Sequence, residues 1–143
     1  LQVAKRLEPL NLMWLEEPVP AENVDAYKLI ADSTSTPICA GENVFLAHGF
    51  RRMLEIGAVD IIMPDIQKAG GLGEGQRMAN LAHLYYVPFA PHMVASFLGA
   101  MASCHVCASV PNFMIGTPQS EVVTEMTVRA AASALPISST ISP

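Results

Sequence analysis

Short apolar runs alternate with longer amphipathic stretches along most of this 143-residue chain. Each of four apolar runs is followed by a stretch whose apolar residues recur at the spacing of a helix, and a fifth run ends the series. The runs are apolar throughout rather than alternating, which is typical of buried parallel strands covered by helices. We therefore predict an α/β fold with strands at 13–15, 37–40, 59–63, 87–90 and 113–115, and helices at 23–33, 46–56, 72–85 and 93–110.

Residues that can carry chemistry follow four of the predicted strands. They are spaced 26, 23 and 27 residues apart and comprise Glu16, Glu42, Asp65 and His92. This period is about that of one strand–helix unit of a (β/α) barrel, and such enzymes place their catalytic groups at the carboxyl ends of the strands. The shared period favours a barrel, and a doubly wound parallel sheet is the competing architecture.

Composition and charge exclude several classes of protein. Hydrophobic residues make up 51% of the chain, too many for a disordered protein. The net charge is −5 and the eight Lys and Arg residues are scattered, which argues against a nucleic-acid-binding face. Three cysteines, an odd number, do not form a disulfide framework, so we expect a cytoplasmic protein.

The segment 93–110 needs a test for membrane insertion. It has no Asp, Glu, Lys or Arg over 18 residues, close to the roughly 20 residues that span a membrane. It also contains three serines, a histidine and many small residues, so we expect a fully buried helix of a globular protein and no membrane partner. Within it Cys104 and Cys107 have C-x-x-C spacing, but no second pair accompanies them and we expect buried side chains.

The four residues at the strand ends suggest a metal site beside an acid–base pair. Glu16 and Glu42 offer the oxygen ligands that Mg²⁺ prefers. Asp65 and His92 come from neighbouring strands, and an Asp hydrogen-bonded to one imidazole nitrogen raises the basicity of the other. A metal with such a pair suits proton abstraction next to a carboxylate. Each residue alone would equally serve as a helix cap, a solvated loop group or a packed histidine, and only their common register favours a site.

Four motifs follow one another in order along the chain: WLEEP at 14–18, GEN at 41–43, MPDIQKAGG at 63–71 and PH at 91–92. Together they resemble the mandelate racemase/muconate lactonizing enzyme family of the enolase superfamily. The similarity runs from about Leu7 to Ile115. It implies a Mg²⁺-dependent enzyme with a (β/α)₈ TIM barrel.

The resemblance also implies roles for individual residues. Glu16 and Glu42 would be Mg²⁺ ligands on the fourth and fifth barrel strands. Asp65 and His92 would be the catalytic dyad on the sixth and seventh strands, which marks the mandelate racemase-like branch. Lys68 lies in the loop after the sixth strand, where we expect a solvated cation or a cation at the edge of the substrate.

Residues 89–92 and 104–113 are most similar to the sugar-acid dehydratases of this family, which remove the proton α to a carboxylate and expel a β-hydroxyl as water. The implied partner is a sugar-acid substrate, and the full-length enzyme is expected to be a homo-oligomer. His92 would protonate the leaving hydroxyl; in a racemase or epimerase it would be one of two bases. A non-catalytic remnant and an α/β module that binds phosphate through the glycine-rich stretch 70–75 remain as alternatives.

Several parts of the family pattern are missing. The third Mg²⁺ ligand, a second base, the first three strands and the capping domain would all precede Leu1, which is not a methionine. We therefore expect residues 1–116 to form strands four to eight of a partial barrel, with negligible activity of the chain alone. Residues 117–143 diverge from the family and are expected to be a disordered tail, for which a shifted reading frame near Gly116 is one hypothesis.

Overall fold

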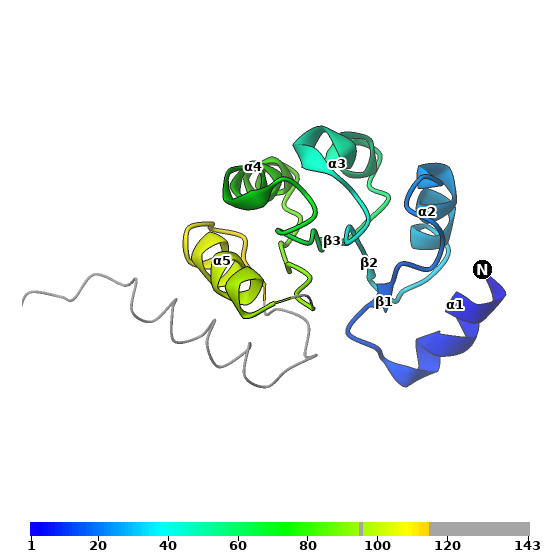
Figure 1. Ribbon diagram of the computed structural model, residues 1–143. Coiled ribbons are helices and arrows are strands. Elements are labelled where there is room, and N and C mark those ends of the chain that lie inside the picture. Colours follow the sequence, from blue (N-terminus) through cyan, green and yellow to red (C-terminus); the bar gives the residue numbers. More distant parts are fainter. Residues whose placement is uncertain (95, 115–143) are drawn as a thin grey trace, which may run out of the picture.

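The computed structural model describes residues 1–94 and 96–114, in which a short helical start is followed by alternating strands and helices (Figure 1). The elements are α1 (Gln2–Leu7), the 3₁₀ helix η1 (Glu8–Leu10), β1 (Leu15–Glu16), α2 (Val24–Ala31), β2 (Ile38–Ala40), α3 (Leu46–Glu55), β3 (Ile61–Ile62), α4 (Gly71–Leu84) and α5 (Phe97–Ala108). All four predicted helices are present, and each begins and ends within a few residues of the predicted bounds. The predicted tail, 117–143, lies outside the described residues.

The strands pair in parallel in the order of the sequence, β1–β2–β3. Single bridges then extend the sheet, from Ile62 to Phe89 and from Phe89 to Phe113. The segments predicted as strands at 87–90 and 113–115 are thus reduced to single bridged residues in the described part, and Ile115 lies outside it. One reason is that Pro88 and Pro91 on either side of Phe89 have no N–H to donate to a longer ladder.

The two faces of the sheet carry separate apolar layers. The larger layer lies under the helices and includes Ile38, Ala40, Ile62 and Phe89. The smaller layer comprises Cys39, Ile61, Met63 and Ala90, with Trp14 and Met114 packed against it. Residues that are neighbours in the strands therefore belong to opposite layers, as in a barrel wall with an outer and an inner face.

Helices α2 to α5 form an arc along one side of the strands (Figure 1). A doubly wound sheet would carry helices on both faces. The observed arrangement is that of a curved barrel wall, so the competing architecture is not found in the described part of the chain. Within this wall α3 packs against α4, and α4 packs against α5.

Helix α5 differs from its expected full burial. Its sheet-facing side is buried and includes Gly99, Ser103, Cys104, Val106 and Cys107. Phe97 and Leu98 in its first turn are 71% and 79% exposed, because α5 is the last helix of the arc and has a helix neighbour on only one flank among the described residues.

The expectation that Cys104 and Cys107 are buried is confirmed. Burial raises the pKa of the Cys107 thiol. No helix in the described ranges is long and apolar enough to cross a membrane.

The loop after β2 depends on a glycine. Gly41 has a φ of +140°, which residues with a side chain rarely adopt. A Cβ added there would lie 2.7 Å from Cε1 of Phe50 and 3.0 Å from the backbone nitrogen of Met63. The backbone therefore passes between α3 and the end of β3 with no room for a methyl group.

We expect Gly41→Ala to lower the free energy of unfolding by about 3 kcal/mol, since it combines backbone strain with overpacking. Gly57→Ala is the matched control, because Gly57 also has a positive φ, +63°, but has no atom within 4 Å of an added Cβ. It should cost about 1 kcal/mol. Urea unfolding followed by circular dichroism measures both. Equal losses would contradict the close-approach explanation.

Candidate active site

The parallel register brings the ends of successive strands to one edge of the sheet. Glu16 is the last residue of β1 and pairs with Cys39 of β2, so Glu42, two residues beyond β2, lies at the same edge. Asp65 follows β3 by three residues, and a parallel bridge joins it to His92. All four predicted residues are therefore at the carboxyl ends of neighbouring strands.

Asp65 and His92 are in direct contact and almost completely buried. Nδ1 of His92 lies 3.2 Å from Oδ2 of Asp65, and the two residues are 6% and 1% exposed respectively. The other carboxylate oxygen of Asp65 accepts hydrogen bonds from the backbone N–H groups of Gln67, at 2.9 Å, and Lys68, at 3.3 Å. These donors hold the carboxylate in place, so that it orients the imidazole ring.

Glu42 contacts the other nitrogen of the same ring. Oε2 of Glu42 lies 2.8 Å from Nε2 of His92. A neutral imidazole donates through one nitrogen only, whereas a protonated imidazole donates through both. With a carboxylate at each nitrogen, His92 lies in a setting where a proton can be held on Nε2 while Nδ1 stays bonded to Asp65.

Glu16 lies on the neighbouring strand and is exposed. One of its carboxylate oxygens accepts a hydrogen bond of 3.2 Å from the indole Nε1 of Trp14. Within the described ranges Glu16 is not part of the hydrogen-bonded network of Glu42, His92 and Asp65. The other oxygen of Glu16 has no protein hydrogen bond there.

The donor set at this edge fits a hard cation. Carboxylate oxygens of Glu16 and Glu42 come from adjacent strands, and Mg²⁺ is commonly held by one or two carboxylates together with water and substrate oxygens. Burial raises the pKa of the nearby Cys39 thiol, and the negative charges of Glu16 and Glu17 raise it further. No group of three or more His, Cys, Asp or Glu side chains is arranged to hold a metal ion in 1–94 and 96–114.

Lys68 contacts the dyad rather than pointing away from it. Its Nζ lies 3.7 Å from Oδ2 of Asp65, and its side chain remains 42% exposed. The ammonium group is therefore both close to the buried carboxylate and accessible from solvent. This position is compatible with the predicted cation at the edge of a substrate.

The glycine-rich stretch does not form a phosphate-binding loop. Residues 71–75 are the first turn of α4, and Gly75 is buried in the helix, where an added Cβ would lie 2.6 Å from Cδ1 of Ile66. A phosphate cradle needs a loop of free backbone N–H groups before the helix begins. The predicted alternative of a phosphate-binding module is not supported by this geometry.

Sequence reasoning missed Glu17 and Asn43. Oε2 of Glu17 accepts a hydrogen bond of 2.8 Å from Nδ2 of Asn43, and the same nitrogen lies 3.2 Å from Oε1 of Glu42. The sequence does contain one indication of their role, since Glu17 directly follows Glu16 and Asn43 directly follows Glu42, the two predicted metal ligands. Regular alternation along a strand would place Glu17 on the opposite face from Glu16.

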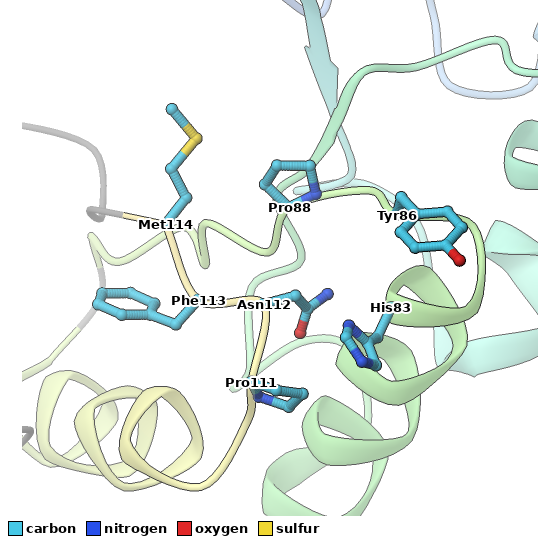
Figure 2. Close-up of a pocket in the computed structure, with 7 residues that line it drawn as sticks. All are labelled: His83, Tyr86, Pro88, Pro111, Asn112, Phe113 and Met114. Carbon is cyan, nitrogen blue, oxygen red and sulfur yellow. The ribbon is translucent and has the colours of Figure 1, made fainter.

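A cavity of about 410 Å³ lies at the other end of the strands, where the last two strand segments begin (Figure 2). It is lined by His83, Tyr86, Pro88, Pro111, Asn112, Phe113 and Met114. The amide nitrogen of Asn112 donates to the carbonyls of Ala79 and Val87, which ties the last segment to α4. This cavity is therefore separate from the candidate active site.

Residues 1–135 match the family model described as enolase C-terminal domain-like. The chain belongs to this family. Membership confirms the resemblance inferred from the four motifs and agrees with the barrel-wall arrangement of strands and helices.

Two enzymes of known activity are similar to this family member. A D-xylonate dehydratase from Haloferax volcanii is 50% identical over 111 residues, 78% of this chain and 27% of the relative. A D-galactonate dehydratase from Ralstonia pickettii is 41% identical over 102 residues, 71% of this chain and 27% of the relative. The chain thus spans about a quarter of the length of these relatives.

A solved structure supports the same fold. It is a mandelate racemase/muconate lactonizing enzyme-like protein from Rubrobacter xylanophilus, with 55% sequence identity and a TM-score of 0.77. The match covers 79% of this chain and 29% of that one.

Asp65→Asn should change the tautomer of His92. The two backbone donors will hold the amide oxygen, so the amide NH₂ will face Nδ1 and require that nitrogen to accept. We expect ¹⁵N spectra of labelled histidine to show a proton on Nδ1 of His92 in the wild type, and a proton on Nε2 with none on Nδ1 in the variant. Signals of the exposed His48 should not move. An unchanged tautomer would contradict the orienting contact.

Proposed function

We propose that this chain carries part of the active site of a Mg²⁺-dependent sugar-acid dehydratase. The observation that carries the proposal is His92, held between a buried Asp65 at Nδ1 and Glu42 at Nε2. The activities named for the two similar dehydratases agree with such a site. The substrate class would be a small polyhydroxylated carboxylate.

His92 would act as the general acid. With Nδ1 bonded to Asp65, the ring delivers a proton from Nε2 to the departing β-hydroxyl, which leaves as water. Burial of both residues keeps the ring in one orientation and excludes competing water from Nδ1. The base that removes the α-proton would lie on an earlier strand, outside this chain.

Glu16 and Glu42 would hold the metal ion. When bound, Mg²⁺ supplies positive charge that stabilises the negative charge developing on the substrate carboxylate as the α-proton leaves. Lys68 would lie at the edge of the substrate, where its exposed ammonium group attracts a carboxylate without displacing Asp65. A third ligand would come from outside the chain.

The finer features of the fold belong to the same proposal. The described strands would be the fourth to eighth of a (β/α)₈ barrel, with the capping domain elsewhere. The complete enzyme would be a cytoplasmic homo-oligomer. Because the chain spans about a quarter of its relatives, we propose that it has negligible activity by itself.

A racemase or epimerase is the second candidate. The observation that favours it is the dyad itself, because a histidine bonded to a buried aspartate serves as well to move a proton to and from the α-carbon as to protonate a leaving group. The products separate the two reactions. A dehydratase forms a 2-keto-3-deoxy acid, whereas a racemase exchanges the α-proton with solvent deuterium and retains every hydroxyl.

In the native protein that carries this chain, His92→Asn should reduce kcat for dehydration by about 10²–10⁴-fold, the usual contribution of general acid–base catalysis. The measurement is formation of the 2-keto-3-deoxy acid from a panel of sugar acids with Mg²⁺. His48→Asn, on the exposed surface of α3, should retain full activity. Deuterium exchange without dehydration in the wild type would instead identify the racemase.

The 143 residues alone should form no detectable keto acid under the same conditions. The physical reason is that the α-proton base and the third metal ligand would be absent. The native protein assayed in parallel shows that substrate and Mg²⁺ are adequate. Dehydration by the isolated chain would overturn the proposed division of the active site.

A further inference from the structure

Glu17 has an unusual backbone conformation beside a proposed metal ligand. Its N–H donates to the carbonyl of Cys39 at 3.0 Å, which continues the ladder of β1, but its φ is +38°. Residues with a Cβ seldom occupy this left-handed region, and where they do the surrounding contacts must hold them. At Glu17 those contacts are made by the carboxylate.

Both carboxylate oxygens of Glu17 bind the loop that carries Glu42. Oε1 accepts from the backbone N–H of Gly41 at 3.3 Å, and Oε2 accepts from the side-chain amide of Asn43 at 2.8 Å. Glu17 therefore contacts the residue before Glu42 and the residue after it. Both oxygens of its carboxylate therefore face this loop.

The amide of Asn43 connects the two glutamates. Its nitrogen carries two protons, and it lies 2.8 Å from Oε2 of Glu17 and 3.2 Å from Oε1 of Glu42. One amide group thus lies between two carboxylates that would otherwise repel each other. The contact engages Oε1 of Glu42 and leaves Oε2 directed at His92.

The backbone at Gly41 is closely packed. An added Cβ would lie 2.7 Å from Phe50 and 3.0 Å from the backbone nitrogen of Met63, so packing sets the position of the N–H that donates to Glu17. The contacts run from this backbone point through Glu17 and Asn43 to Glu42. Partners of this kind orient metal ligands in proteins generally.

We propose that Glu17 and Asn43 are positioning residues for Glu42, which hold its carboxylate at the strand edge where Glu16 and Glu42 would bind a divalent cation. This inference rests on the proposed function, because it requires Glu16 and Glu42 to form a cation site. It adds that the second glutamate of the WLEEP motif acts through Asn43 and not by binding the metal.

Mn²⁺ binding to the native protein tests the proposal without any activity assay. Free Mn²⁺ is followed by its electron paramagnetic resonance signal during titration. Glu17→Ala and Asn43→Ala should each raise the Kd by about 10-fold, the lower end of the range for partners of metal ligands. Glu17→Gln should weaken binding to a similar extent, since Gly41 and Asn43 both donate to Glu17 and a glutamine amide offers only one acceptor oxygen.

Two controls separate positioning from a general loss of charge. Glu22→Ala removes an exposed carboxylate a few residues away and should leave the Kd within about 2-fold, because an exposed charge is well screened. The double variant Glu17→Ala/Asn43→Ala should bind Mn²⁺ no more weakly than the weaker of the single variants. Such non-additivity is expected for residues that act through one contact. Additive losses would overturn the proposal.

The outcomes distinguish this inference from the proposed function. If the wild type binds no Mn²⁺, or if Glu16→Gln leaves binding intact, the cation site itself is wrong and both fail. If Glu16→Gln abolishes binding but Asn43→Ala binds normally, only the positioning role is overturned. Asn43 is exposed, so its variant should fold even if Glu17→Ala unfolds, which circular dichroism would reveal.

Discussion

The parallel register of the short strands is the constraint on which the rest of the structure depends. Leu15 pairs with Ile38 and Cys39 pairs with Ile61, so each strand end arrives at the same edge. Strands of two or three residues supply few hydrogen bonds. The packing of the apolar layers on the two faces therefore does much to determine the register of the strands. A slip of one residue would exchange Cys39 with Ala40 between these layers and would turn every strand-end side chain to the wrong face.

The order of strands and helices could be predicted from the sequence because apolar runs and helical spacing are local signals. Strand lengths were overestimated, because an apolar run does not show how many of its residues donate to a ladder, and Pro88 and Pro91 beside Phe89 have no N–H to donate. The absence of charge in 93–110 correctly predicted a helix but not its surroundings. Phe97 and Leu98 are exposed because burial depends on which neighbours α5 meets, and a run of uncharged residues does not encode them.

The candidate site could be predicted as a set of residues but not as a network. Spacing brought Asp65 and His92 to neighbouring strand ends, and the structure joins them. Spacing did not indicate that Glu42 would contact Nε2 of the same ring, because a side chain's partner depends on loop geometry. Glu17 was beyond such reasoning, since strand alternation assigns Glu16 and Glu17 to opposite faces and the positive φ at Glu17 breaks that alternation.

The concentration of like charge at this edge explains why so many donors gather there. Glu16, Glu17, Glu42 and Asp65 are four carboxylates within a few residues of three strand ends, an arrangement that opposes folding unless each carboxylate is compensated. Asp65 is compensated by backbone N–H groups and His92, and Glu17 by Gly41 and Asn43. Among the described residues, Glu16 accepts from an indole, and Glu42 contacts one amide proton and the imidazole, which is weak compensation for two negative charges. The least compensated pair at the edge is therefore the pair that a divalent cation would stabilise most.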